Sequence, residues 1–376
     1  MRIVSASAVP VRVPLAQEFT SALGTSRATE AGVLRVTTDD GQTGLGEIAL
    51  TWHGDGGQLC SVVNEVLAPA LVGMDPFDVV RVREVTSAAF AFGRHSLTAV
   101  AAVEMALLDL QGRALGVPGY RLLGGLARDR VELSMSLPIA AVESVVGTAR
   151  AYADQGFGAV KVKAGDDADH CVETVAAVRA ALGDAVKIRV DLNMACTQAK
   201  AALALMRRLE PHGVISVEQP LPADDLEGLA LLRARSPLPV MADESVWSPA
   251  DAWEVLRRGA ADLVNVYVSE AGGPFEARRI IDLCALAHTG VVIGSMPELG
   301  IGTAAAAHVA FAAARIDQPS DVAGHLYHAR DVVSPGSLRI EGGYLLPPQG
   351  VGLGVELDEE ALAELRTDGD GPAGSS

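Results

Sequence analysis

Three acidic side chains, each at the end of a short apolar run, are the residues of this sequence best placed to do chemistry. Asp191 follows Ile-Arg-Val, Glu218 follows Ile-Ser-Val and Asp243 follows Val-Met-Ala. If these runs are neighbouring parallel strands, the carboxylates meet at one mouth and repel each other unless a cation compensates them. Oxygen ligands without His or Cys favour Mg²⁺ over zinc. Each acid alone could simply cap the following helix, but three in succession favour a metal site.

Two lysines precede this acidic set. Lys161 and Lys163 flank Val162, so both side chains point to the same face of a strand. Solvated lysines at a strand edge are the alternative to a buried pair, which is costly without partners. Two neighbouring ammonium groups lower each other's pKa, so one lysine can act as a general base. A metal with a lysine base predicts removal of the proton α to a carboxylate, because the metal stabilises the doubly negative intermediate.

A repeating unit would position these groups. Short apolar strands alternate with helices rich in Ala, Leu, Arg and Glu, and the last residues of successive strands are 24 to 28 positions apart. Such alternation implies parallel strands. A barrel is favoured over an open, doubly wound sheet because no glycine-rich dinucleotide turn follows residue 163. The expected strands are 131–138, 159–163, 188–191, 215–218, 240–243, 264–267 and 292–295, with an eighth unclear around 320–326.

The first third of the chain has a different pattern. Residues 33–47 alternate apolar and polar side chains around Asp-Gly, which is typical of a hairpin, and residues 96–116 have a helical pattern. The expected divisions are an α+β capping domain (1–125), a catalytic barrel (126–330), a C-terminal return to the cap (331–367) and a flexible tail (368–376).

Composition limits the partners. The 376 residues, 49% of them hydrophobic, suffice for a barrel and a smaller domain. With 47 acidic and 30 basic residues the net charge is −17, which disfavours nucleic acid and anionic membranes as partners. No apolar run reaches the ~20 residues of a membrane span, and four scattered cysteines are expected to be free thiols. We expect a soluble, cytoplasmic protein that binds a small carboxylic acid.

Several runs together resemble the muconate-lactonizing-enzyme subgroup of the enolase superfamily, over nearly the whole chain. They are Val-Lys-Val-Lys (160–163), Val-Asp-Leu-Asn (190–193), Val-Glu-Gln-Pro-Leu (217–221), Ala-Asp-Glu-Ser (242–245), Met-Pro-Glu-Leu-Gly-Ile-Gly (296–302) and, in the cap, Gly-Leu-Gly-Glu (44–47). The resemblance implies an α/β fold, a (β/α)7β-type TIM barrel with an α+β capping domain. It also implies one Mg²⁺ per subunit with a lysine base, and a homo-oligomer, either a dimer or an octamer.

The same resemblance implies roles for individual residues. Asp191, Glu218 and Asp243 would be the Mg²⁺ ligands. Lys163 would be the general base, and Lys161 would support the substrate carboxylate and lower the pKa of Lys163. A larger group is expected around the metal and the substrate: Asn193, Glu244, Glu298, Ser295, Phe19, Trp52 and His53, while His325 and His328 could touch the substrate or lie in the core or at the surface.

Tyr267 departs from the pattern of the subgroup, whose members usually have a lysine at this position. Two opposed lysines permit racemisation or epimerisation. The histidine of the mandelate-racemase branch is absent as well, because Ser295 and Glu298 stand near the seventh strand end. A phenol with a pKa of about 10 is a poor base but can act as an acid. Lys163 and Tyr267 together therefore favour β-elimination.

The preferred function is a Mg²⁺-dependent lyase that dehydrates a hydroxylated cyclic amino acid, cis-3-hydroxy-L-proline. Its α-hydrogen and 3-hydroxyl lie on opposite faces, as expected for Lys163 and Tyr267 on either side of the ring. The alternatives are a racemase or epimerase of an amino-acid derivative, a cycloisomerase in which Tyr267 only fills space, a sugar-acid dehydratase, and a binding protein that has lost catalysis.

Overall fold

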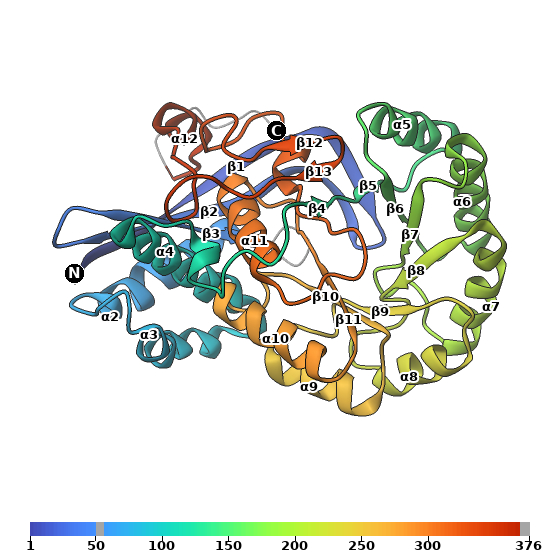
Figure 1. Ribbon diagram of the computed structural model, residues 1–376, viewed down its shortest axis with the longest axis horizontal. Coiled ribbons are helices and arrows are strands. Elements are labelled where there is room, and N and C mark those ends of the chain that lie inside the picture. Colours follow the sequence, from blue (N-terminus) through green and yellow to red (C-terminus); the bar gives the residue numbers. More distant parts are fainter. Residues whose placement is uncertain (50–55, 369–376) are drawn as a thin grey trace.

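Seven parallel strands form a curled sheet in the computed structural model of the protein, which describes residues 1–49 and 56–368 (Figure 1). Each strand pairs with the next along the chain, in the order β5 to β11. The strands are β5 (Met135–Leu137), β6 (Ala159–Lys163), β7 (Lys187–Asp191), β8 (Val214–Glu218), β9 (Val240–Ala242), β10 (Leu263–Val266) and β11 (Gly290–Ile293). The helices that follow them are α5 (Val142–Asp154), α6 (Ala168–Leu182), α7 (Ala199–Leu209), α8 (Leu226–Arg235), α9 (Pro249–Arg258), α10 (Pro274–Leu286) and α11 (Gly300–Ala312). The expected barrel is confirmed.

Local sequence explains how each unit begins and ends. All five residues of β6 are buried, as expected for a parallel strand covered on both faces. Helix α9 begins with Pro249 after Ser248, whose hydroxyl accepts a hydrogen bond from the backbone N–H of Asp251 (3.1 Å). It ends at Gly259, whose φ of 61° is left-handed. Ser248, Pro249 and Gly259 thus fix where α9 begins and ends. The end of a helix in turn limits where the next strand can start, and therefore which side chain stands at the carboxyl end of that strand.

The barrel closes without a regular eighth strand among the described residues. The segment 317–321 takes that place, because Asp321 N donates to Ile293 O (2.8 Å) on one side and Ser134 N donates to Ser320 O (2.8 Å) on the other. A short 3-10 helix, Gly324–Tyr327, follows. The strand expected around 320–326 is therefore an irregular closing segment that ends at Asp321.

Three short strands outside the barrel form a small antiparallel sheet of their own. The strand expected over 131–138 is split into β4 (Val131–Glu132) and β5. β4 pairs with β13 (Tyr344–Leu345), which in turn pairs with β12 (Ile340–Glu341). After α12 (Glu359–Leu365), Thr367 N donates to Pro10 O (3.0 Å). The C-terminal segment thus contacts the first strand of the chain.

The cap lies over the carboxyl ends of the barrel strands. Its antiparallel sheet comprises β1 (Ile3–Ser21), β2 (Gly24–Thr38) and β3 (Thr43–Ala49), and its described helices are α1 (Cys60–Val62), α2 (Ala68–Leu71), α3 (Val79–Thr86) and α4 (Leu97–Leu115). Figure 1 shows the β1–β2 hairpin reaching across to β5, where Ile139 N donates to Thr20 O (2.9 Å). The Glu47 carboxylate accepts hydrogen bonds from Leu299 N and Gly302 N, which joins β3 to the start of α11.

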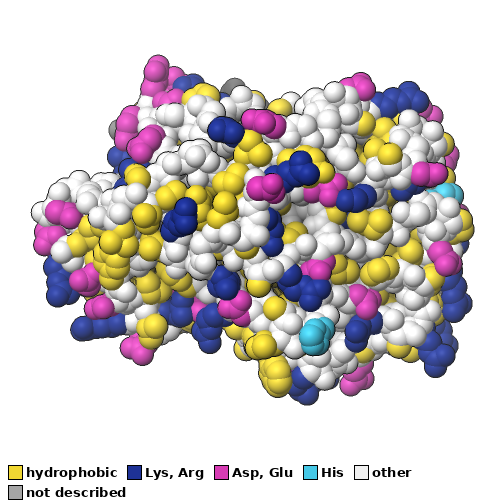
Figure 2. Space-filling view, in the orientation of Figure 1, with side chains coloured by type: hydrophobic (Ala, Val, Ile, Leu, Met, Phe, Trp, Pro, Cys, Tyr) yellow, Lys and Arg dark blue, Asp and Glu magenta, His cyan; other side chains and the backbone are white. Residues whose placement is uncertain are grey.

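Charged side chains of both signs are interspersed over the face in Figure 2, without a large patch of one sign. Within the described ranges, none of the helices combines the length and the apolar character that crossing a bilayer requires.

Candidate active site

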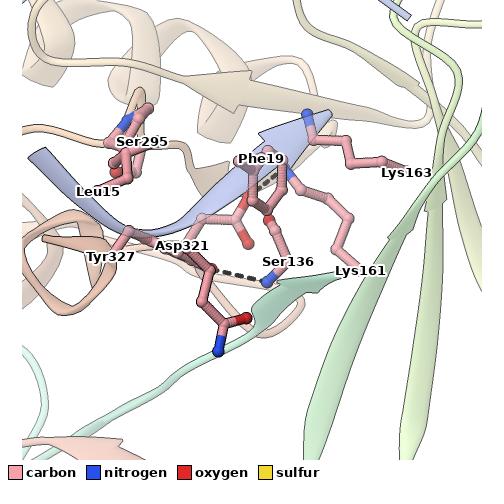
Figure 3. A pocket seen from close by; sticks show the side chains of 10 residues that line it. Leu15, Phe19, Ser136, Lys161, Lys163, Ser295, Asp321 and Tyr327 are labelled. Carbon is pink, nitrogen blue, oxygen red and sulfur yellow. Dashed lines mark hydrogen bonds and ion pairs between the residues drawn. The ribbon is translucent and has the colours of Figure 1, made fainter. Parts of the chain in front are cut away.

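A pocket of about 490 Å³, partly open to solvent, lies where the β1 arm crosses the barrel mouth (Figure 3). Leu15, Gln17 and Phe19 are alternate residues of β1, so one face of the arm points toward the pocket. The lining residues are Leu15, Gln17, Phe19, Ser136, Lys161, Lys163, Ser295, Pro297, Asp321 and Tyr327. Phe19, which was expected to contact the substrate, lines the pocket. Trp52 and His53, for which the same was expected, lie outside the described residues.

Lys161 and Lys163 extend from β6 toward this pocket (Figure 3) and are only 1% and 9% exposed. Lys163 Nζ donates to Asp191 Oδ2 (2.6 Å) and to Asn193 Oδ1 (3.1 Å). Lys161 Nζ donates to Asp321 Oδ2 (2.6 Å). The pair is therefore buried and hydrogen-bonded, and it is not solvated at a strand edge.

The three predicted metal ligands come together. Asp191, Glu218 and Asp243 each offer a carboxylate oxygen, and these oxygens lie within 4.8 Å of one another. All three side chains are buried. Burial and neighbouring carboxylates raise the pKa of Asp191 and of Asp243 above the ordinary range. A compact, buried set of carboxylate oxygens fits Mg²⁺, and the ion would supply positive charge for a substrate carboxylate.

Glu218 is held by two buried cations. Arg189 Nη2 donates to Glu218 Oε2 (2.6 Å), and Lys161 Nζ donates to Glu218 Oε1 (3.1 Å). Burial acts to raise the pKa of Glu218, but the charges of Lys161 and Arg189 outweigh it and hold that pKa below the usual range. Burial acts to lower the pKa of Lys161, yet Asp321 and Glu218 raise it above the ordinary value. Lys161 is therefore held in its charged form by Asp321 and Glu218.

Two members of this network were not singled out from sequence. Arg189 shares one face of β7 with Asp191, two positions further along, and that alternation was a usable signal. Asp321 accepts from Arg189 Nη1 (3.0 Å) and from Lys161. It lies in the irregular closing segment, where no periodicity marks which side chain points inward.

Asn193 and Glu244 extend the contacts of Lys163 along the barrel mouth. Asn193 accepts from Lys163 and donates from Nδ2 to Glu244 Oε1 (3.0 Å). Glu244 Oε2 is buried and has no hydrogen-bond partner among the residues that the structure describes. Burial raises the pKa of Glu244 to about 7, with Asp191 adding to the effect. Both residues lie beside the carboxylates, where sequence placed them.

Tyr267 follows β10 and is hydrogen-bonded to one of the predicted metal ligands. Its hydroxyl donates to Asp243 Oδ2 (3.3 Å), and the side chain is buried. Burial, reinforced by Asp243 and other carboxylates, raises the pKa of Tyr267 well above its usual value. The phenol is therefore protonated and acts as a hydrogen-bond donor.

Apolar side chains fix the Tyr267 ring. It packs in a buried cluster with Leu97, Trp247 and Met296, which we call the aromatic cluster. The ring also lies over Gly294, where an added Cβ would stand 2.3 Å from the Tyr267 Cε2 atom. A residue larger than glycine at 294 would displace the ring, so this close approach explains the glycine.

The remaining predicted contacts are divided between pocket and core. Ser295 lines the pocket, and its hydroxyl is hydrogen-bonded to Glu298, whose pKa burial raises to about 7. His328 is buried, with Nε2 2.8 Å from Thr29 Oγ1. His325 lines a separate hollow. The core or surface alternative therefore fits both histidines better than substrate contact.

Sequence comparisons identify the family. The profile of the mandelate racemase/muconate lactonizing enzyme N-terminal domain matches residues 3–124, and that of the enolase C-terminal domain-like family matches residues 128–361. The chain belongs to the enolase superfamily. This enolase-superfamily chain falls in the mandelate racemase/muconate lactonizing enzyme group, and the resemblance expected from its motifs is confirmed.

Individual relatives of this enolase-superfamily chain match it almost end to end. The L-Ala-D/L-Glu epimerase of Bacillus subtilis is 34% identical, covering 94% of this chain and 97% of its own. Muconate cycloisomerase 1 of Rhodococcus opacus is 33% identical, covering 96% and 98%. The structure of the N-succinyl Arg/Lys racemase from Bacillus cereus superposes with a TM-score of 0.92 at 26% identity, covering 97% and 98%.

These relatives change the preferred reaction. Enolase-superfamily enzymes use Mg²⁺, and the buried triad of Asp191, Glu218 and Asp243 fits that ion. The relatives named here are epimerases, racemases and cycloisomerases, so they favour the isomerase alternatives. They give no support to the dehydration of cis-3-hydroxy-L-proline that was preferred from sequence.

Proposed function

We propose that this enzyme is a Mg²⁺-dependent isomerase of the cycloisomerase type, which moves the proton α to a carboxylate with a single base, Lys163. The observation that carries the proposal is the unequal chemistry around the carboxylate triad. Lys163 lies in the pocket and can exchange a proton, whereas Tyr267 is a buried phenol hydrogen-bonded to Asp243.

The surroundings of Lys163 suit proton transfer. In the ring-opening direction Lys163, as a neutral amine, takes the α-proton and becomes an ammonium. The ring C–O bond at the β-carbon breaks as the C=C bond forms, and the released carboxylate stays in the product. In ring closure the carboxylate adds back to the β-carbon and the same nitrogen returns the proton to the α-carbon. Asp191 Oδ2 and Asn193 Oδ1 accept from Nζ and would stabilise the ammonium form. Lys161, held by Asp321 and Glu218, keeps a positive charge near the substrate carboxylate.

Tyr267 argues against two-base racemisation. That reaction needs a proton carrier on each face of the α-carbon, and the family pattern places the second carrier at position 267. A phenol whose pKa is raised well above its usual value does not remove an α-proton near neutral pH. Of the epimerase, racemase and cycloisomerase activities of the relatives named above, cycloisomerisation is the one that a single base can complete.

Elimination is the second one-base reaction, but it also needs an acid for the departing hydroxide. The Tyr267 hydroxyl already donates to Asp243, and the ring is held in the aromatic cluster. The relatives favour isomerisation as well. We therefore rank dehydration of cis-3-hydroxy-L-proline below cycloisomerisation.

A substrate panel in deuterated water tests the proposal. The protein with Mg²⁺ would be incubated with muconate and muconolactone, which appear in the names of its relatives. Parallel samples would contain N-succinyl amino acids, L-Ala-L-Glu and cis-3-hydroxy-L-proline. Nuclear magnetic resonance and chiral chromatography follow deuterium at the α-carbon, configuration, ring opening and water loss.

We expect deuterium to enter with one stereochemistry, together with interconversion of an open and a cyclic acid. Exchange with inversion would replace the proposal by a two-base racemase. Loss of water from cis-3-hydroxy-L-proline would restore the lyase. Retention of α-exchange by Lys163→Ala would contradict every version of the mechanism.

A further inference from the structure

The three carboxylates of the triad are held by donors of different charge. Asp191 and Glu218 each accept hydrogen bonds from cationic side chains, whereas Asp243 accepts from a neutral one. The donors are Lys163 and the Asn193 backbone to Asp191, Arg189, Lys161 and Asn265 to Glu218, and Tyr267 to Asp243. Within residues 1–49 and 56–368, the Tyr267 hydroxyl is the one side-chain donor to the Asp243 carboxylate.

Tyr267 is itself held by the cap. Leu97, the first residue of the long cap helix α4, packs in the aromatic cluster with Tyr267 and Trp247. The cap also contacts Trp247 through Arg94, whose guanidinium lies 5.0 Å from the indole centroid, and through His95, whose ring centroid is 5.2 Å away. A continuous line of contacts thus runs from the cap to Asp243.

We propose that Tyr267 is a positioning residue that fixes the Asp243 carboxylate for Mg²⁺, and that cap packing on the aromatic cluster maintains this position. Because the Tyr267 hydroxyl donates to Asp243 Oδ2, it fixes the rotation of the carboxylate group. The direction of the second oxygen, Oδ1, is fixed with it. The inference rests on the metal site and not on which reaction the enzyme performs.

The neutral charge of the phenol matters for this role. A lysine at 267 could also donate to Asp243, but its ammonium would repel a divalent cation held by the same carboxylate. The phenol orients the ligand without that repulsion. Hydrogen-bonding partners of metal ligands commonly change metal affinity by about 10–100-fold when removed, because the ligand loses its fixed orientation.

The substitution Tyr267→Phe separates the hydroxyl from the ring. The phenylalanine keeps the packing against Leu97 and Gly294 and loses only the hydrogen bond. We expect Mg²⁺ affinity, measured by titration calorimetry without substrate, to fall about 10-fold. Tyr152→Phe is the matched control, because Tyr152 lies on α5 and packs against Phe157. It should leave the Mg²⁺ dissociation constant unchanged.

A second variant tests the link to the cap. Leu97→Ala leaves the hydroxyl in place but removes the side chain that holds the ring. We expect a loss of Mg²⁺ affinity in the same direction as Tyr267→Phe but smaller, in protein whose circular dichroism shows a native fold. Unchanged affinity in folded Leu97→Ala would overturn the role of the cap.

Two results would overturn the role of Tyr267. One is a Mg²⁺ dissociation constant for Tyr267→Phe within twofold of the parent value. The other is loss of α-proton exchange in Tyr267→Phe at saturating Mg²⁺, which would make Tyr267 a proton carrier and not a positioning residue. A parent protein that binds Mg²⁺ but isomerises nothing in the panel would count against the proposed function alone.

Discussion

The two sides of the carboxylate triad are built differently. On the side of β6 to β8, Lys161, Lys163 and Arg189 contact carboxylates at 2.6–3.1 Å in a buried ionic network. On the side of β9 to β11, Tyr267 meets Asp243 through one neutral hydrogen bond, and its ring packs in the aromatic cluster. On the proposed mechanism, proton transfer is confined to the first side, and the second side holds the Asp243 carboxylate in place.

This difference shows how a barrel can change reaction type at one strand end. The carboxylates need only converge, and each can be oriented by either a charged or a neutral donor. Exchanging a cationic donor for a phenol keeps the ligand set but removes a proton carrier. The family can therefore retain its metal site while the set of groups that move protons changes.

Removal of Lys163 should have the largest effect, because it eliminates the reactive side of the comparison. We expect Lys163→Ala to lower the rate of α-proton exchange by about 10⁴-fold, the upper range for a general base, with Mg²⁺ still bound. The measurement is deuterium incorporation at saturating substrate. Lys187→Ala is the control, since Lys187 is exposed and paired with Glu132. An exchange rate within tenfold of the parent would exclude Lys163 as the base.

Breaking the ionic network comes next. Arg189→Met leaves Glu218 and Asp321 buried with one cation fewer, so the free energy of unfolding should fall by about 3–5 kcal/mol. Urea denaturation followed by fluorescence measures this change. Arg257→Met, which removes an exposed pair with Glu254, should change it far less, because exposed ion pairs contribute little to stability. Equal effects of the two substitutions would show that the buried network stabilises the fold no more than an exposed ion pair does.

The apolar side should respond to pH through Glu298. Burial raises its pKa from 4.5 to about 7, so the folded state binds this proton more tightly than the unfolded state does. Its contribution to stability is complete below pH 4.5 and is lost as the pH rises through about 7. Glu298→Gln should therefore flatten the stability profile between these values, by about 3 kcal/mol at most. The measurement is the free energy of unfolding from urea denaturation at each pH. A Glu298→Gln profile as steep as that of the parent protein would contradict this prediction. Glu341→Gln, at an exposed position, is the control.

The smallest effect should come from making the two sides alike. Tyr267→Lys supplies a second amine, and Gly294 leaves room for its unbranched chain. We expect weak deuterium exchange with inversion, about 100-fold slower than exchange by Lys163, because the new amine is not optimally placed. Chiral chromatography detects the inverted product, and Tyr267→Phe, which adds no amine, should give none. Inversion by the parent protein itself would remove the distinction between the two sides.

The barrel, the triad and the lysine pair were predictable because each depends on a local pattern. Polar residues ended apolar runs at a regular spacing, and alternation placed Lys161 and Lys163 on one face. The backbone geometry repeats along a regular strand, so the position of a residue in the sequence predicts the face on which its side chain lies. The seven expected strands agree with β4 to β11 to within a few residues.

The rest depends on contacts between distant segments. Asp321 is 160 positions from Lys161, and Leu97 meets Tyr267 only when the cap lies on the barrel. The residue type of Tyr267 suggests an acid or a side chain that fills space, but it does not indicate that the hydroxyl contacts Asp243 or that the ring lies over Gly294. No periodicity encodes which partner a buried polar side chain will meet.

The irregular closing segment has a consequence for folding. Ser320 bridges to Leu133, and Asp321 N donates to Ile293 O, so the contacts of Asp321 with Lys161 and Arg189 lie where the barrel closes. Lys161 and Asp321 are 160 positions apart in the chain. Closing a loop of that length early in folding is entropically unfavourable, and contacts between distant residues generally form slowly. In a barrel that has not closed, Lys161 and Arg189 would keep Glu218 as a partner but lose Asp321, and the Asp321 carboxylate would have neither cation. Competence for catalysis should therefore appear together with the final cooperative step of refolding, and not before it.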